Sequence, residues 1–189
     1  MHTGLKQYNL DSFKVASRHL KSNARFYRLQ LMRLTTFTDY TLRVLMYLAI
    51  EPSRLATIPE IASAYGISEN HLMKVVHRLA RTGLIESVRG KGGGIRLAHP
   101  ATDIRLGQVI RASEGDAVIV ECFSAENNTC CITPACRLTK ILADTFDGFY
   151  QALDAFSLAD LVTNPIQLGQ LLSIKKLQSP CSGALVSLD

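Results

Sequence analysis

Four cysteines stand within fifteen residues of one another, in the otherwise polar segment Cys122-Phe-Ser-Ala-Glu-Asn-Asn-Thr-Cys130-Cys131-Ile-Thr-Pro-Ala-Cys136. A cysteine by itself is most often a small buried apolar residue, but four in a polar loop are poorly explained in that way. Three explanations remain for the group: a metal site, a redox-active disulfide, or chance.

The spacing of these cysteines favours an iron–sulfur cluster over zinc. The paired CxxC units of a zinc ribbon are missing, whereas thiolates are the usual ligands of iron–sulfur clusters. Adjacent Cys130 and Cys131 seldom serve one site together, so three well-spaced sulfurs are available. A fourth ligand must then come from elsewhere, or the site is left labile and open to a small molecule.

Composition and charge indicate a protein with a polyanion-binding part. The chain has 189 residues, 47% of them hydrophobic, which is ample for a core. Residues 1–99 hold fifteen basic and six acidic residues, and residues 100–189 hold six basic and ten acidic ones. No apolar run reaches the roughly 18 residues of a membrane span, and no signal peptide opens the sequence. We therefore expect a cytoplasmic protein, without membrane partners, in which cysteines stay reduced.

The hydrophobic pattern predicts a winged helix-turn-helix head. It indicates helices over 36–50, from Thr57 to a glycine turn at Gly66, and from Ser68 to Gly83, followed by strands over 84–88 and 95–98. We expect Thr36 or Thr38 to cap the first helix, and Thr57 and Glu60 to form a capping box on the second. Two short helices and a β-hairpin in this order are typical of DNA-binding domains.

The candidate DNA-binding residues lie on the third helix and at the hairpin tip: Ser68, Asn70, His71, Lys74, Arg78, Arg81, Arg89 and Lys91. Asparagine pairs with adenine and lysine reaches guanine in the major groove, while the arginines at the far end of the helix suit phosphates. Arg89 and Lys91 suit a narrowed minor groove. The glycine-rich tip is neither a phosphate-binding loop nor a dinucleotide fingerprint, because no helix opens after it.

The second half of the chain predicts a helix over 104–113 and a long helix over 134–156. The long helix has an apolar residue every three to four positions and would extend roughly 34 Å, beyond a compact head. A second copy of the chain is the simplest partner for this stripe, and folding back on its own domain is the alternative. The predicted fold is mainly α with a small β-hairpin. It divides into a basic extension over 1–31 ahead of an alternative start at Met32, a head over 32–100, a cluster and dimerisation region over 101–174, and a tail over 175–189.

Three stretches resemble the iron–sulfur winged-helix transcription regulators. They are Met32-Arg-Leu-Thr-Thr-Phe-Thr-Asp-Tyr40, Ser87-Val-Arg-Gly-Lys-Gly-Gly-Gly94 and Cys130-Cys-Ile-Thr-Pro-Ala-Cys-Arg-Leu138. The resemblance covers about residues 32–174 and is closest to the nitric-oxide-sensitive repressors of that family. The cysteine loops of its cluster-biogenesis regulators are richer in glycine and supply a histidine ligand, which this loop lacks.

The resemblance implies a homodimeric repressor that binds an inverted-repeat operator in double-stranded DNA, carries a [4Fe–4S] cluster and releases DNA when nitric oxide nitrosylates the cluster. It implies that Cys122, Cys130 and Cys136 are ligands and that Asp39 of the other subunit is a replaceable fourth one. Asp39 equally suits the start of a helix. Cys131 is interpreted as a bystander, or as a spare thiol that could replace a ligand in a mutant, and Cys181 as a bystander. The gap between Cys122 and Cys130 is longer than in some relatives.

Three alternatives stay open at this point. The first is a regulator of the same fold that senses iron or redox state through a [2Fe–2S] cluster. The second is a thiol-redox enzyme, which is disfavoured because the sequence has no CxxC motif beside a βαβ pattern and no supported Ser/His/Asp arrangement. The third is a zinc-stabilised interaction module. We expect a regulator and not an enzyme.

Overall fold

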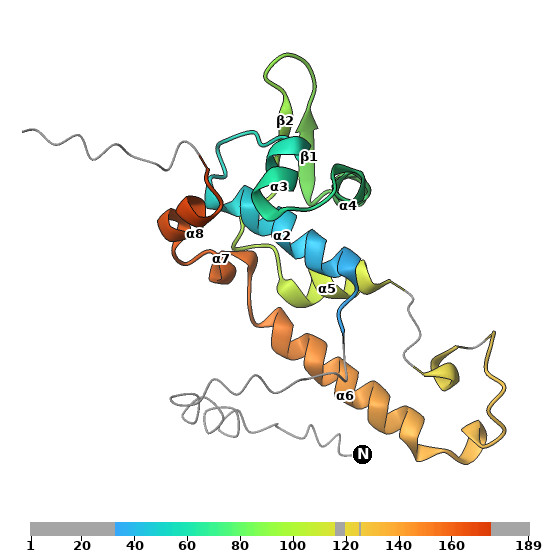
Figure 1. Ribbon diagram of the computed structural model, residues 1–189. Helices are drawn as coiled ribbons and strands as arrows, with labels where there is room; N and C mark the ends of the chain where they lie inside the picture. Colours follow the sequence, from blue (N-terminus) through green and yellow to red (C-terminus); the bar gives the residue numbers. More distant parts are fainter. Residues whose placement is uncertain (1–32, 116–119, 125, 175–189) are drawn as a thin grey trace, which may run out of the picture. The chain divides into compact units, whose positions relative to one another are not determined.

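The computed structural model describes residues 33–115, 120–124 and 126–174 (Figure 1). Every helix and strand reported below belongs to the unit that begins at Leu34. The predicted extension over 1–31, the start at Met32 and the tail over 175–189 all lie outside the described residues. The division of the rest into two regions stays a prediction.

The helix α2, Thr36–Ile50, confirms the first predicted helix, but its cap is a different residue. The side chain of Thr35 accepts a hydrogen bond from the backbone nitrogen of Thr38, so the prediction of Thr36 or Thr38 as the cap was wrong. The side chain of Thr38 is fully buried instead, where it packs into the core below the first turn. Runs of adjacent threonines offer several caps, and burial decides among them.

Two further helices follow as the sequence predicts: α3, Ile58–Tyr65, and α4, Glu69–Arg81. Thr57 and Glu60 form the predicted capping box on α3. Gly66 ends α3 with φ of 64°, a left-handed conformation that glycine adopts at little cost. Leu72, Val75, Val76 and Leu79 bury the inner face of α4.

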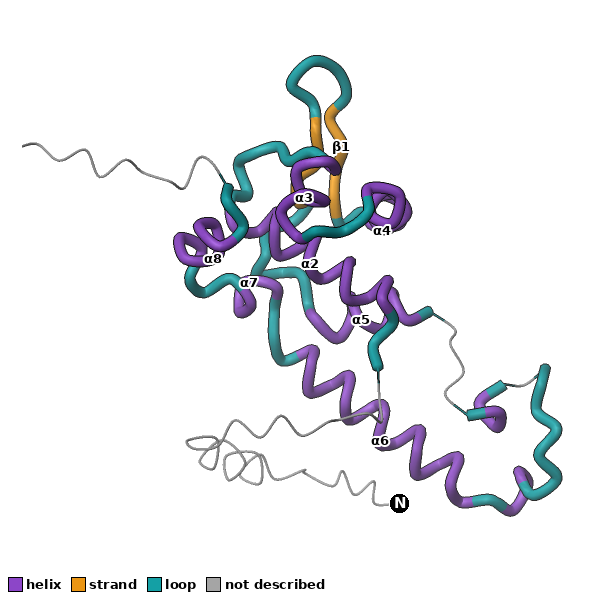
Figure 2. The backbone as a smooth tube through the Cα atoms, in the orientation of Figure 1, coloured by secondary structure: helices purple, strands orange, loops and turns teal. Residues whose placement is uncertain are grey.

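The hairpin consists of β1, Ile85–Val88, and β2, Gly94–Leu97, paired antiparallel with Ile85 opposite Leu97 (Figure 2). Its base is fixed to the segment before α3, because Ala56 and Ile95 exchange backbone hydrogen bonds of 3.0 and 2.8 Å. Gly94 permits this contact, since a Cβ there would lie 2.6 Å from the Ala56 carbonyl oxygen. The wing is therefore attached rigidly to the helix-turn-helix.

The second half begins with α5, Leu106–Glu114, and continues through α6, Arg137–Asp154. Both begin later than the sequence predicts. Ile104 belongs to an extended segment whose carbonyl accepts from the Leu158 amide, and Pro134 lies in a separate 3-10 turn over Thr133–Ala135. At 18 residues, α6 extends about 27 Å.

Two short helices close the described chain: α7, Leu158–Leu161, and α8, Pro165–Leu171. Neither helix was predicted from the sequence, because helices of 4 and 7 residues are too short to show a periodic hydrophobic pattern. They seal one hydrophobic core, in which Leu158 and Ile174 are fully buried beside Leu45, Ile61 and Leu72. The head thus shares its core with the last part of the described chain, up to Ile174.

The apolar residues of α6 have a different environment. None of its residues is buried, and Leu138 and Ile141 are each more than half exposed. Phe156, two residues after the end of α6, is also more than half exposed. Among the described residues, no helix is long and apolar enough to span a membrane. The prediction that a second copy of the chain covers the exposed apolar residues of α6 stays a prediction.

Candidate functional site

The outward face of α4 carries the polar residues that the sequence proposes for DNA contact. Asn70, Lys74 and Arg81 are exposed and lie about one and then about two helical turns apart on one face, opposite the buried face of α4. Ser68 is exposed at the N-cap position, although its side chain makes no capping hydrogen bond. These four residues can face a DNA groove together.

Two more side chains belong to this face, and the sequence analysis missed them. His77 lies between Lys74 and Arg81 on the same stripe, and Met73 is half exposed beside it. The spacing of His77, seven residues after Asn70, was a signal that could have identified it, because positions seven apart share a helix face. The candidate reading stripe is therefore Asn70, Lys74, His77 and Arg81.

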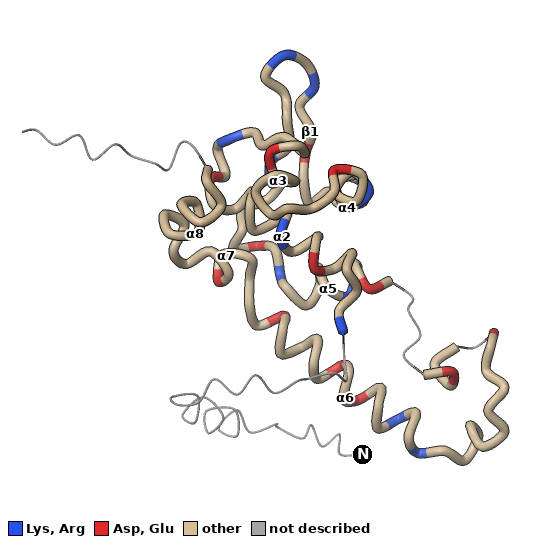
Figure 3. Tube along the Cα trace, in the orientation of Figure 1, with Lys and Arg blue, Asp and Glu red and all other residues tan. Residues whose placement is uncertain are grey.

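The wing tip provides a second basic site. Arg89 and Lys91 are exposed at the tip of the hairpin, where Figure 3 shows basic residues. Gly90 and Gly92, with φ of 103° and 79°, form the turn in conformations that favour glycine. The two cations stand clear of the body of the hairpin, as minor-groove contacts require.

His71 and Arg78 point to the sides of α4 and contact neighbouring helices. The His71 ring lies 6.2 Å from that of Tyr40 on α2, above a small apolar hollow that Lys74 also lines. The Arg78 guanidinium Nη2 donates a 2.9 Å hydrogen bond to the Ala112 carbonyl oxygen on α5. Both residues were predicted as DNA contacts, and both have a partner within the protein.

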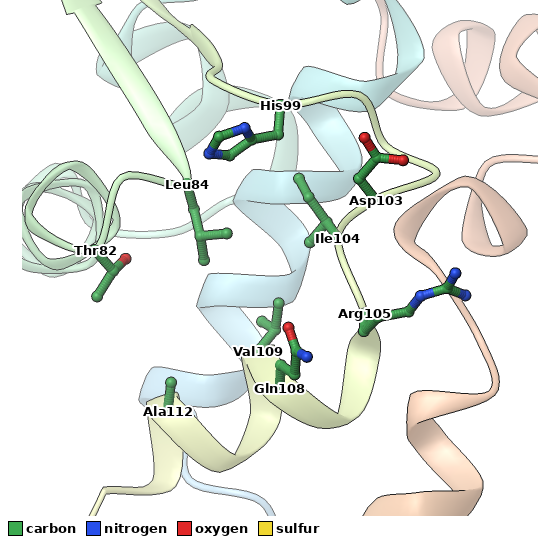
Figure 4. A pocket seen from close by; sticks show the side chains of 9 residues that line it. All are labelled: Thr82, Leu84, His99, Asp103, Ile104, Arg105, Gln108, Val109 and Ala112. Atoms are coloured by element: carbon green, nitrogen blue, oxygen red, sulfur yellow. The ribbon is translucent and has the colours of Figure 1, made fainter.

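A larger hollow of about 420 Å³ opens between the end of α4, the hairpin base and α5 (Figure 4). Ile104 and Val109 form its apolar floor, and His99, Asp103 and Arg105 stand at its rim. None of the residues proposed for DNA or cluster binding lines it. The candidate site is therefore a surface and a loop, not a closed pocket.

The cysteine loop is held by its own polar side chains. The Glu121 carboxylate accepts hydrogen bonds from the amide and hydroxyl of Thr129, and these contacts lower the pKa of Glu121. The Asn128 side chain bonds to Thr133 and to the Cys130 amide. These hydrogen bonds connect separate parts of the loop, and the Phe123 ring lies 6.5 Å from the Phe146 ring on α6.

The four described cysteines are free thiols, which excludes a disulfide among them here. Cys122 and Cys136 are half-buried, and Cys130 and Cys131 are exposed. Within the described ranges, no three His, Cys, Asp or Glu side chains gather as a metal-binding group. Cys136 is the N-cap of α6, a helix end that favours negative charge. Three reduced thiols on one loop, one at a helix amino end, are a donor set that suits an anionic iron–sulfur cluster.

Asp39, the candidate fourth ligand, lies in the first turn of α2 and is bound by Arg43. The Arg43 Nη2 and Nε atoms lie 2.9 and 3.1 Å from the two carboxylate oxygens of Asp39. The same guanidinium sits 5.7 Å from the centre of the Tyr65 ring on α3. Asp39 is about half exposed and can be approached from outside.

The amino end of α3 is fixed by a polar cluster. The Tyr47 hydroxyl donates a 2.8 Å hydrogen bond to Glu60, and the Arg54 Nη1 atom lies 2.7 Å from the same carboxylate oxygen. Burial, together with the Glu60 contact, raises the pKa of Tyr47 to about 12. Burial alone would raise the pKa of Glu60, but the hydrogen bonds from Tyr47 and Arg54 outweigh it and lower this pKa. This cluster orients α3 and therefore the helix-turn-helix.

Comparison with known proteins identifies the family. A family model described as Rrf2, iron-dependent transcriptional regulator, matches residues 34–164. The chain belongs to the Rrf2 family. It is 47% identical over 146 residues to the HTH-type transcriptional regulator NsrR of Bacillus subtilis, covering 77% of this chain and all of that one. The NsrR of Geobacillus kaustophilus is 43% identical over 146 residues, covering 77% of this chain and 99% of its own.

Solved structures of the family show the same fold. IscR of T. potens aligns with a TM-score of 0.56 at 26% identity, covering 71% of this chain and 89% of that one. CymR of B. subtilis, described as the global cysteine regulator, aligns with a TM-score of 0.56 at 28% identity, over 70% and 98% of the two chains. These relatives confirm the winged-helix fold, the family resemblance and the prediction of a transcriptional regulator and not an enzyme.

Proposed function

We propose that this Rrf2-family regulator is a homodimeric transcriptional repressor whose DNA binding responds to nitric oxide through an iron–sulfur cluster. The observation that carries the proposal is the set of Cys122, Cys130 and Cys136 as free thiols on the loop that leads into α6. The relatives named NsrR at 42–47% identity support it, because the sequence resembles the nitric-oxide-sensitive branch of the family.

The DNA-binding part of the proposal rests on α4 and the wing. The stripe of Asn70, Lys74, His77 and Arg81 would enter the major groove, and Arg89 and Lys91 would reach the flanking minor groove. Two copies related by a two-fold axis would present two such stripes, so the operator should be an inverted repeat. The exposed face of α6 would supply the dimer contact, since Leu138, Ile141 and Phe149 otherwise remain in contact with water.

The cysteine loop would hold a [4Fe–4S] cluster through Cys122, Cys130 and Cys136, with Asp39 of the partner as fourth ligand. When bound, the cluster supplies iron with which nitric oxide reacts. A carboxylate is a hard ligand for soft iron–sulfur chemistry, so Asp39 is the ligand that a small molecule would displace. Arg43 would then recover its two-point contact with the released carboxylate.

The test is a DNA-shift assay on the full chain, purified and assayed without oxygen. The DNA is an inverted-repeat duplex that the cluster-loaded protein has selected from random sequences. We expect tight binding with the cluster and at least about tenfold weaker binding after a nitric-oxide donor. Equal affinity before and after the donor contradicts the proposal. Absorbance and electron paramagnetic resonance spectra of the same samples distinguish a [4Fe–4S] from a [2Fe–2S] cluster. A [2Fe–2S] cluster would favour a regulator that senses iron or redox state.

A further inference from the structure

The last turn of α5 connects three other helices through side-chain contacts. The Glu114 carboxylate accepts hydrogen bonds of 2.9 and 3.3 Å from the amide and hydroxyl of Thr35, the cap of α2. The Arg111 guanidinium lies 3.3 Å from the Asp154 carboxylate on α6 and stacks 4.7 Å from the centre of the Tyr150 ring. The carbonyl of Ala112 accepts from Arg78 on α4.

The Arg78 contact is the connection from this turn to the recognition helix. Within the described part of the chain, it is the single hydrogen bond or ion pair between α4 and α5. Ala112 lies among the last four residues of α5, whose carbonyls lack donors within the helix. A guanidinium is a favourable partner there, because it satisfies the carbonyl and complements the negative end of the helix dipole.

The position of Arg78 on α4 agrees with this inward role. Residues 70, 74, 77 and 81 form the outward stripe. Residue 78, the next along the helix after 77, lies to the side of that stripe that faces α5. Arg81 lies on that stripe and has no hydrogen bond or ion pair among the described residues. Two arginines three residues apart therefore have different partners.

The same turn leads toward the cysteine loop. Gly115 ends α5 with φ of 63°, and the described chain resumes at Val120, two residues before Cys122. The cysteine loop therefore follows directly in sequence after the turn of α5 to which Arg78 is hydrogen-bonded. We propose that Arg78 is a positioning residue that fixes the recognition helix to the last turn of α5 and does not contact a DNA phosphate. We further infer, on the basis of the proposed function, that the Arg78 contact transmits changes in the cysteine loop to α4.

The experiment compares Arg78→Met with Arg81→Met in the full chain, using the selected inverted-repeat duplex. Methionine keeps an unbranched stem and removes the charge and the donors in both variants. DNA affinity is measured over a range of salt concentrations, for cluster-loaded and cluster-free protein. Each phosphate contact contributes about 0.9 to the slope of log affinity against log salt, so the slope reports whether a charge touches DNA.

We expect Arg78→Met to lose about tenfold in affinity at an unchanged salt slope, from one charge-assisted hydrogen bond. The affinity ratio of cluster-loaded to cluster-free protein should fall toward one, and amide hydrogen exchange in the second half of α4 should accelerate. Arg81→Met should lower the magnitude of the slope by about 0.9 per subunit and leave the affinity ratio unchanged.

A slope that falls by about 0.9 per subunit in Arg78→Met would overturn the positioning role, and so would affinity, exchange and ratio that all match the wild type. Circular dichroism of both variants verifies that they fold, and hydrogen exchange in α4 reports on the contact without any DNA. Wild-type protein that binds DNA equally with and without cluster would refute the proposed function. The salt slopes and hydrogen exchange would still decide whether Arg78 positions α4.

Discussion

Asp39 and Arg43 form a two-point ion pair across one turn of α2, with distances of 2.9 and 3.1 Å between their nitrogen and oxygen atoms. Both side chains are about 40–50% exposed, so the pair contributes at most about 1 kcal/mol. A second partner for Asp39 therefore needs to overcome only a small free energy. This is the property expected of a carboxylate that exchanges between a cation and a metal.

We predict that Asp39→Ala shortens the lifetime of the cluster at least about tenfold under a chelator, because it removes the proposed fourth ligand. Arg43→Gln should change the lifetime less than about fivefold, since it removes only a competing surface ion pair. The decay of cluster absorbance without oxygen measures both. Equal lifetimes for wild type and Asp39→Ala would remove Asp39 from the ligand set.

Lys74 lies in the middle of the outward stripe on α4. We predict that Lys74→Ala weakens DNA binding by about 5- to 150-fold, because a side chain that reads a base contributes about 1–3 kcal/mol. Iron and sulfide content should not change. The matched control is Lys140→Ala on α6, whose side chain is 81% exposed and pairs only with Asp144 among the described residues. An equal loss in both variants would indicate general electrostatics instead of a specific contact.

The Glu60 carboxylate accepts hydrogen bonds from Tyr47 and Arg54, in the group of polar side chains that orients α3. Because its pKa is lowered on folding, its stabilisation is present above the ordinary carboxyl pKa and is lost as the pH falls through the folded value. We predict that Glu60→Gln lowers the free energy of unfolding by about 1–2 kcal/mol at pH 7, and by less at acidic pH. Chemical denaturation between pH 3 and pH 7 measures the effect.

The control for Glu60 is Asp144→Asn, which breaks an exposed ion pair with Lys140 on α6. We expect this variant to match the wild type within about 0.5 kcal/mol at every pH, as exposed pairs do. A Glu60→Gln variant that is destabilised equally at pH 3 and pH 7 would show that packing, and not the charge of Glu60, fixes α3.

Gly107 is buried where α5 crosses α6, and a Cβ there would lie 2.5 Å from the Tyr150 carbonyl oxygen. We predict that Gly107→Ala lowers the free energy of unfolding by about 1–3 kcal/mol, because the two helices must separate. Gly148→Ala on α6 is the control, since a Cβ there meets nothing within 4 Å. It should stabilise the protein by up to about 1 kcal/mol. Denaturant titration of both variants measures the difference.

The sequence predicted the head well because local signals and burial agree there. Thr57 and Glu60 form the predicted capping box, Gly66 adopts the predicted left-handed turn, and the inner face of α4 is buried as its periodicity indicates. Composition and spacing also identified the outward face of α4, apart from His77 and Met73. These features depend on residues close together in the chain, which a pattern can report.

The features that the sequence did not reveal depend on contacts between distant residues. Burial of Thr38 moves the cap of α2 to Thr35, and the carbonyl of Ala112 draws Arg78 away from the DNA-facing stripe. Helices α7 and α8 are too short for a periodic signal, and the core they seal needs Leu158 and Ile174 from the end of the chain. No periodicity in the sequence reports these partners.

The ligand set of the cysteine loop can be tested residue by residue with two neighbouring thiols. We predict that Cys130→Ala loses the cluster, whereas Cys131→Ala retains it, because only three well-spaced thiols serve the site and adjacent ones seldom share it. Iron and acid-labile sulfide per protein chain measure the outcome. Retention of a full cluster by Cys130→Ala and its loss in Cys131→Ala would reassign the ligand.

The central claim is that Cys122, Cys130 and Cys136 hold an iron–sulfur cluster on the loop before α6. Its most direct test is the iron and sulfide content of the full chain purified without oxygen, with Cys136→Ala beside it. The account predicts a coloured wild-type protein with about four iron and four sulfide per chain for the [4Fe–4S] form, and a colourless variant. A colourless, iron-free wild type that still binds its operator and responds to nitric oxide would contradict the account.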